Sequence, residues 1–159
     1  MEEVREKRGL TYGVYSGFSP MQVAGPFMIN LQTRAELAEG TLELVQRLVA
    51  EYLEKGPTDA ELARSKREVA GSFPLSTASN SDIVGQLGSI GFYDLPLTHL
   101  EDFMQQVQAL SVEDVKAAMN KHLSPDDFVI VTAGPQVEQK PLPPPSTKPL
   151  EQPSSVPEH

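Results

Sequence analysis

Cysteine and histidine, the residues that most often bind zinc, are scarce in this chain. The sequence of 159 residues contains no cysteine and three histidines, so disulfide bridges, thiol nucleophiles and cysteine-ligated metals are excluded. His99, His122 and His159 are separated by at least 23 positions, whereas a histidine-based site commonly places two of them four positions apart on one helix. Neither His-Glu-x-x-His nor His-x-x-Glu-His occurs. We therefore expect no metal or other cofactor in this chain.

Positive charge is also in short supply. Lys and Arg number 13 against 22 Asp and Glu, which gives a formal net charge of −9. No surplus of cations is present to neutralise phosphates, so a nucleic acid is not an expected partner. No apolar run approaches the roughly 20 residues that a membrane helix needs, and the charged start, residues 1–8, does not resemble a signal peptide. We expect no membrane insertion, and the compartment, periplasm or cytoplasm of a bacterium, stays open.

Hydrophobic periodicity is missing from the last part of the chain. Residues 136–159 contain seven of the 14 prolines and four aliphatic residues, too few to offset the entropy lost on ordering. This composition predicts a disordered or polyproline-type tail at 136–159 and a folded domain at 1–135. An alternative interpretation is a docking ligand, because Pro141-Leu142-Pro143-Pro144 fits a P-x-x-P pattern.

Three segments have the character of strands. A charged helical segment, Glu2–Arg8, ends at Gly9 and precedes two strand candidates, Thr11–Phe18 and Pro26–Thr33, which we expect to pair antiparallel. Near the end of the domain, Phe128–Ala133 is continuously apolar, which is typical of a strand buried on both faces in the middle of a sheet.

The residues between these strands are expected to be helical. Four capping-box patterns mark helix starts, and Gly56-Pro57 ends the first long helix. The boxes are Thr33/Glu36, Thr58/Glu61, Thr98/Glu101 and Ser111/Asp114. The order predicts a two-layer α+β domain with a mostly antiparallel sheet covered on one face by helices. Three strands are few for so many helices, so either strands remain undetected or the domain lacks its N-terminal part.

Several segments match, in order, the pattern of one family. Arg5 to Tyr12 reads Arg-x-x-x-Gly-Leu-x-Tyr, and the other segments are Gly56–Leu62 with Lys66, Gly91–Pro96, Leu110–Val115 and a final strand ending in Gly134-Pro135. Over residues 2–135 the chain resembles the C-terminal domains of the pitrilysin/insulinase family of zinc metallopeptidases, the inverzincins, whose catalytic motif is His-x-x-Glu-His.

The resemblance implies one half of a two-part enzyme with the fold seen in LuxS and mitochondrial processing peptidase. Family members pair two homologous α+β domains or subunits around a chamber. One half carries the zinc-binding helix, and the other supplies an Arg and a Tyr, seven positions apart, that reach the peptide substrate beside the metal. The matching residues here are Arg5 and Tyr12, and zinc would belong to the partner domain or subunit.

The family pattern also includes a strand and a helix before the segment that matches Glu2–Arg8. The resemblance therefore predicts that this chain is a fragment without its first strand and helix. A sheet edge exposed in this way invites pairing with another copy, through domain swapping or edge addition, so a homo-oligomer is an expected partner state.

The chemistry of peptide hydrolysis suits the two residue types. Water adding to a zinc-polarised carbonyl creates an oxyanion, which a Tyr hydroxyl or an Arg guanidinium can stabilise. Without the resemblance, Arg5 would be read as a solvated surface residue and Tyr12 as a packing residue. Arg8 stands only four positions from Tyr12, and Tyr15, on the opposite strand face, is expected in the core or an interface.

We therefore expect the substrate-binding half of a zinc-dependent peptidase, inactive on its own, with Arg5 and Tyr12 as its catalytic residues. A second interpretation is a non-proteolytic structural or assembly homologue with the same fold. A third is a generic α+β interaction module that uses its proline-rich tail for docking. Peptide specificity stays open, because half of the chamber would lie in the partner.

Overall fold

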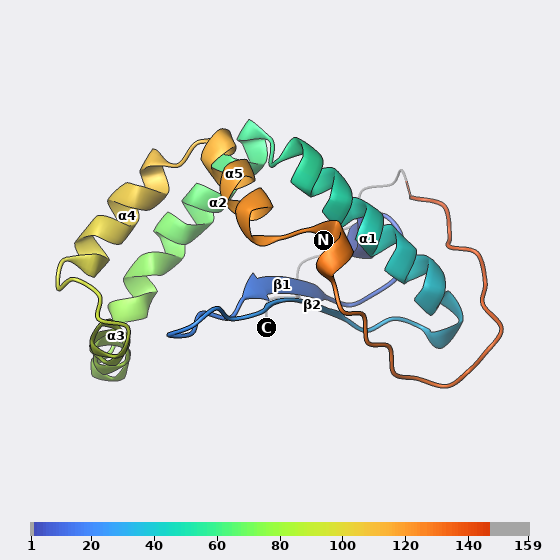
Figure 1. Ribbon diagram of the computed structural model, residues 1–159, viewed down its shortest axis with the longest axis horizontal. Helices are drawn as coiled ribbons and strands as arrows, with labels where there is room; N and C mark the ends of the chain where they lie inside the picture. The colour runs from blue at the N-terminus through green and yellow to red at the C-terminus, as the bar shows by residue number, and fades with distance from the viewer. Residues whose placement is uncertain (1, 147–159) are drawn as a thin grey trace, which may run out of the picture. The chain divides into compact units, whose positions relative to one another are not determined.

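The computed structural model describes residues 2–146, in which helices greatly outnumber strands (Figure 1). In chain order the elements are η1 (Glu2–Glu6), β1 (Val14–Phe18), β2 (Phe27–Leu31), η2 (Ala35–Leu37), α1 (Ala38–Lys55), α2 (Asp59–Ser72), η3 (Phe73–Thr77), α3 (Asn80–Phe92), α4 (His99–Ala109), α5 (Val112–His122) and η4 (Pro125–Asp127). The α+β fold class is thereby confirmed.

The chain divides into two compact units. Of the described residues, unit 1 contains 2–49 and 129–146, with η1, β1, β2, η2 and most of α1. Unit 2 contains 50–128, from the last turn of α1 to η4. Both expected site residues, Arg5 and Tyr12, belong to unit 1.

The two N-terminal strands form the antiparallel hairpin that the sequence predicts. Val14 pairs with Leu31 at one end and Phe18 with Phe27 at the other, where the two aromatic rings lie 4.9 Å apart. Alternate residues of β2 are half-buried and exposed, in agreement with the predicted period of two. One face of this strand is therefore turned toward the rest of unit 1.

A small apolar core holds η1 against the first half of α1. Its central residues are 2–4% exposed, and three further side chains pack around them. The central residues are Val4, Leu10, Leu37 and Leu44, and the surrounding ones are Val45, Leu48 and Leu142. Burial of side chains of this size contributes about 1.5–3 kcal/mol each, so the core fixes the segment that precedes the hairpin.

Unit 2 is held together by contacts between its helices. The rings of Phe73 and Phe103 stack with centroids 5.3 Å apart. The Lys66 ammonium on α2 donates to the carbonyl oxygens of Gln108 and Leu110, at 2.8 and 2.6 Å, where α4 ends. The Asn120 amide on α5 donates to the carbonyl of Leu53 at 2.8 Å. Polar groups thus link α2 with the end of α4, and α5 with the end of α1.

Two of the four predicted capping boxes are present. Thr58 with Glu61 caps α2, and Ser111 with Asp114 caps α5, each through reciprocal side-chain and backbone hydrogen bonds. The first long helix ends as predicted, at Gly56 with φ of 76°.

The other two predicted boxes are wrong. The Thr33 hydroxyl donates instead to the Leu10 carbonyl at 2.7 Å. Thr98 has helical backbone angles, φ −79° and ψ 0°, and its side chain caps no backbone N–H of α4. Its hydroxyl donates to the Asp102 carboxylate.

The prediction of a central strand at Phe128–Ala133 is also wrong for the described structure. No strand is assigned there, and Val129 and Val131 are 89% and 86% exposed. A central strand needs a hydrogen-bonded neighbour on each edge. Among residues 2–146 the sheet consists of β1 and β2, which pair with each other, so this segment has no place between two strands.

The predicted tail begins at residue 136, and the structure describes its first part, 136–146. The backbone N–H of Lys140 donates to the Glu36 carbonyl at 2.7 Å, and that of Ser146 donates to the Lys7 carbonyl at 2.6 Å. Leu142 contacts the unit 1 core. This stretch differs in these contacts from a freely solvated tail. The remainder, 147–159, lies outside the described residues, and the domain boundary at 135 stays a prediction.

Candidate functional site

Arg5 lies on η1, a single π-helical turn at the start of unit 1. Its neighbour Val4 is 2% exposed and anchors the turn in the core, whereas the Arg5 side chain is exposed. Gly9 ends the turn with φ of 58°, a conformation that favours glycine, and its N–H donates to the Arg5 carbonyl at 2.9 Å. Local structure therefore presents the Arg5 guanidinium to solvent.

Tyr12 lies shortly after the turn that carries Arg5. The Leu10 N–H donates to the Val4 carbonyl at 3.0 Å, so the chain leaves the core next to the turn that carries Arg5. The Thr11 hydroxyl then donates to the Gly13 carbonyl at 2.7 Å and accepts from the Gly13 N–H at 3.1 Å. The Tyr12 side chain between them is fully exposed, at 100%. This full exposure differs from the packing role that Tyr12 would have been given without the resemblance.

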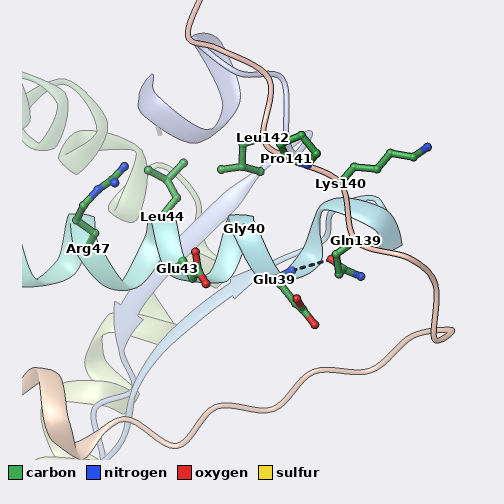
Figure 2. A pocket seen from close by; sticks show the side chains of 9 residues that line it. All are labelled: Glu39, Gly40, Glu43, Leu44, Arg47, Gln139, Lys140, Pro141 and Leu142. Carbon is green, nitrogen blue, oxygen red and sulfur yellow. Dashed lines mark hydrogen bonds between the residues drawn. The ribbon is translucent and has the colours of Figure 1, made fainter.

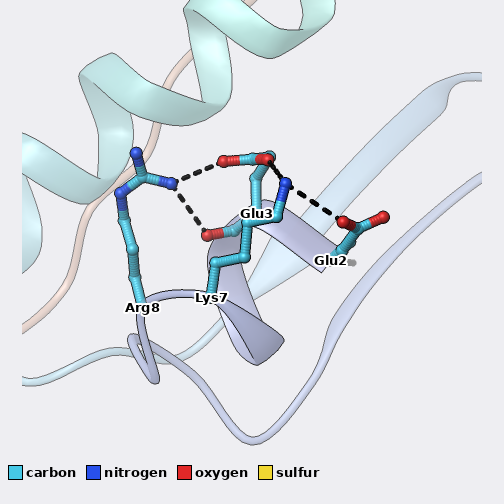
Figure 3. A network of polar contacts seen from close by, with 4 residues as sticks. All are labelled: Glu2, Glu3, Lys7 and Arg8. Carbon is cyan, nitrogen blue, oxygen red and sulfur yellow. Dashed lines mark hydrogen bonds and ion pairs between the residues drawn. The ribbon is translucent and has the colours of Figure 1, made fainter. Parts of the chain in front are cut away.

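Arg8, the alternative arginine of the segment, has a different environment (Figure 3). Its guanidinium donates to a Glu3 carboxylate oxygen at 2.6 Å and to the Glu3 carbonyl at 3.2 Å. Lys7 also pairs with Glu3 and with Glu2. The Arg8 side chain is 14% exposed. Within residues 2–146, by contrast, no ion pair or side-chain hydrogen bond engages Arg5.

The charges of this network stabilise one another. Hydrogen bonds from Lys7 and then Arg8 lower the pKa of the Glu3 carboxyl below its ordinary value of 4.5. The bond to Glu3, followed by that to Glu2, raises the pKa of Lys7 above 10.5. At neutral pH Glu3 and Lys7 are therefore charged and paired, on the same segment as the exposed Arg5.

The described residues offer no site for a metal ion. Among residues 2–146 there is no cluster of three or more histidine, aspartate or glutamate side chains. His99 is the first residue of α4 and His122 the last of α5, and Asp126 and Asp127 lie in the turn η4. No helix in this range is both long and apolar enough to cross a membrane.

The structure places the two predicted residues on one exposed segment of unit 1, but no hydrogen bond joins their side chains in the described part of the chain. Sequence reasoning missed the Glu3 network and the contact of Leu142 with the core. The spacing of Glu3 and Lys7, four positions on a helical turn, could have indicated the first. No local pattern indicated the second, because it joins residues about a hundred positions apart.

The described residues form an α+β domain that exposes both Arg5 and Tyr12. Residues 1–69, which include both side chains, match the family described as the peptidase M16 inactive domain. Over these residues the chain is similar to that family.

Similar proteins agree with that assignment. A curated relative called non-peptidase homolog YmxG, from Helicobacter pylori, is 30% identical over 83% of this chain and 31% of its own length. The uncharacterized zinc protease YmxG of Bacillus subtilis is 27% identical over 84% of this chain and 32% of its own. A crystal structure of a peptidase M16 inactive domain from Pseudomonas fluorescens is 70% identical, with a TM-score of 0.85, over 90% of this chain and 34% of that one. The chain thus spans about a third of the length of these relatives.

Proposed function

We propose that this chain is the substrate-binding part of a zinc-dependent peptidase and that Arg5 and Tyr12 act on peptide bound at a zinc ion held by another domain or subunit. The chain alone then hydrolyses nothing, since the zinc-binding His-x-x-Glu-His is not in its sequence. The observation that carries the proposal is the contrast between the two arginines of one segment. Arg8 is paired with Glu3, whereas Arg5 is exposed and unpaired within the described residues.

The environment of Arg5 and Tyr12 suits contact with an extended substrate. A guanidinium that is not engaged within its own domain keeps its fork of N–H donors for a peptide carbonyl. A phenol exposed at 100% keeps its O–H for a developing oxyanion. Both groups stand on backbone fixed by buried Val4 and Leu10, so their positions need little further ordering when substrate binds.

The test uses the complete protein that contains this segment together with its zinc-bearing half. Turnover of an unfolded peptide substrate is measured for Arg5→Ala and Tyr12→Phe. Each substitution is expected to lower turnover by about 100- to 1,000-fold, the usual cost of losing one oxyanion donor. Zinc content and the far-UV circular dichroism spectrum should not change, because neither side chain has a partner in the described residues.

Two matched controls accompany these variants. Tyr15→Phe removes a hydroxyl from a tyrosine that is 70% exposed three positions away, and Arg34→Ala removes an exposed arginine outside the segment. Both are expected to keep normal turnover. Full turnover in Arg5→Ala and Tyr12→Phe would contradict the site assignment.

A second candidate is a non-proteolytic structural homologue, which the name of the Helicobacter pylori relative, non-peptidase homolog, favours. The two functions differ in what the complete protein does with zinc and peptide. Tight zinc binding with peptide hydrolysis supports the peptidase. A correctly folded complete protein that binds no zinc and cleaves no peptide supports the structural homologue.

A docking role for the proline-rich segment has less support. The Leu142 side chain, in the centre of the P-x-x-P pattern, packs against the unit 1 core. A partner that recognised this pattern would first have to displace it.

A further inference from the structure

Residues 139–146, called the strap below, run along unit 1 beside the first half of α1 (Figure 2). Leu142 contacts the core formed by Val4, Leu10, Leu37 and Leu44. It also lies directly over Gly40, where an added β-carbon would be 2.9 Å from the Leu142 Cγ. Glycine at position 40 therefore makes room for this leucine on the surface of the helix.

Polar contacts fix the strap on both sides of Leu142. The Gln139 amide donates to the Ala35 carbonyl at 2.9 Å, and its oxygen accepts from the Glu39 N–H at 3.2 Å. The Glu39 N–H lies in the first turn of α1, where backbone N–H groups lack partners within the helix. The Ala35 carbonyl belongs to η2 and also accepts the Ala38 N–H. At the other end of the strap the Ser146 N–H donates to the Lys7 carbonyl at 2.6 Å. The strap thus joins the start of α1 to the segment that carries Arg5.

The strap fills its groove only in part. A cavity of about 330 Å³ remains between the strap and α1, lined by Glu39, Gly40, Glu43, Leu44 and Arg47 of the helix and by 139–142. A core side chain is normally surrounded on all sides. Leu142 instead sits at the edge of an open cavity, on an extended segment with no strand partner in the described residues.

We propose that the strap is a detachable intramolecular ligand: the groove on α1 binds it through Leu142, and its binding orders the segment Arg5–Leu10. The attached state packs the partly buried Leu142 against the unit 1 core and holds the Lys7 carbonyl. The detached state exposes this groove and loosens the turn that presents Arg5. The occupant of the groove is accordingly this strap of the same chain. This inference does not depend on the proposed peptidase function.

Hydrogen exchange of the whole chain tests the proposal. The reporters are the N–H groups of Lys7, Gly9 and Leu10, which donate to backbone carbonyls of η1. Leu142→Asp and, more mildly, Gln139→Ala should each accelerate exchange of these amides, by about tenfold or more for Leu142→Asp, while the capped amides of Glu61 and Asp114 in unit 2 keep their protection. Val137→Asp, at a half-exposed position just before the strap, should change neither group.

A synthetic peptide with the sequence of 137–146 provides the second arm. Added to Leu142→Asp, it should restore protection of the η1 amides, whereas the same peptide with aspartate in place of leucine should not. Unchanged exchange of the η1 amides in Leu142→Asp would overturn the proposal. So would simultaneous loss of protection in both units for both strap variants, because the strap would then be an inseparable part of the fold.

Discussion

Single side chains set the stability of unit 2 through a few well-placed contacts, and Lys66 is the clearest case. Its ammonium donates to the carbonyls of Gln108 and Leu110 at the end of α4, where a cation also meets the negative end of the helix dipole. Lys66→Met keeps the aliphatic stem but removes both bonds. We expect a loss of about 1 kcal/mol in the free energy of unfolding, measured by urea denaturation.

A lysine in an ordinary surface ion pair supplies the comparison. Lys55 approaches Glu51 at 3.9 Å and is 68% exposed, so Lys55→Met should change stability by only a few tenths of a kcal/mol. Equal effects of the two substitutions would show that the carbonyl contacts of Lys66 do not stabilise the unit.

The capping carboxylates predict how stability responds to acid. Hydrogen bonds from Thr58 lower the pKa of Glu61 below 4.5, and hydrogen bonds from Ser111 lower the pKa of Asp114 below 3.8. A group whose pKa is lowered by folding stabilises the folded state above its unfolded pKa, and this stabilisation is lost as pH falls through the folded pKa. The melting temperature should therefore fall as pH decreases below about 4.5.

Thr58→Ala tests the cause of that dependence, since it removes the hydroxyl that bonds to Glu61. Its melting temperature should be lower at pH 7 and should fall less steeply between pH 5 and pH 3 than that of the unchanged chain. An acid dependence identical in both proteins would contradict the assignment to this cap.

The helices α4 and α5 both begin with a capping-box sequence pattern, but their N-terminal structures differ. Ser111 has extended backbone angles, φ −98° and ψ 169°, and its hydroxyl accepts the Asp114 N–H of α5. Thr98 has helical angles and gives α4 no such bond. Ser111→Ala should therefore cost about 1 kcal/mol, whereas Thr98→Ala should cost clearly less, as measured by thermal unfolding. A larger loss for Thr98→Ala would contradict this reading of the two caps.

These starts show what the sequence can and cannot predict about the elements. Residue types and spacing locate each helix to within a few positions, because propensity and periodicity act locally. Whether a Ser or Thr caps a helix depends on its backbone angles. At Thr98 these angles are set by the preceding turn, in which the His99 N–H donates to the Pro96 carbonyl. At Thr33 a tertiary bond to the Leu10 carbonyl takes the hydroxyl away. Such contacts are not encoded in a pattern four residues long.

At the candidate site, too, local features could be predicted from the sequence and tertiary contacts could not. The spacing of Arg5 and Tyr12, taken with the resemblance, predicts a site on this segment, and Gly9 predicts where its helical turn ends. The different environments of Arg5 and Arg8 could not be predicted, because they depend on which arginine reaches Glu3 across the turn. The contact of Leu142 with the core could not be predicted from the sequence either. A proline-rich composition indicates that a segment has little tendency to fold by itself. It does not indicate whether another part of the chain forms a groove that binds the segment.

At the scale of the whole molecule, three apolar segments stand out because no charged residue interrupts them. β1, β2 and residues 128–133 contain no Lys, Arg, Asp or Glu and no proline. Natural sheets commonly place charges or prolines on exposed edges to prevent pairing with another chain. The exposed edges of β1 and β2 therefore lack the residues that commonly prevent such pairing. We propose that a second copy of the chain pairs with these apolar segments.

For the chain of 159 residues this proposal predicts concentration-dependent self-association through β1, β2 and the apolar segment 128–133. Val129→Lys places a charge in the apolar run at a position that is 89% exposed, and Leu97→Lys makes the same change in unit 2, also at 89% exposure. The two variants have the same net charge, so they differ only in where the lysine stands. Sedimentation velocity over a concentration series should show that Val129→Lys shifts the chain toward monomer while Leu97→Lys does not. An equal shift in both variants would mean that association follows general apolar exposure rather than strand pairing, and a chain that is monomeric throughout would show that its edges need no cover.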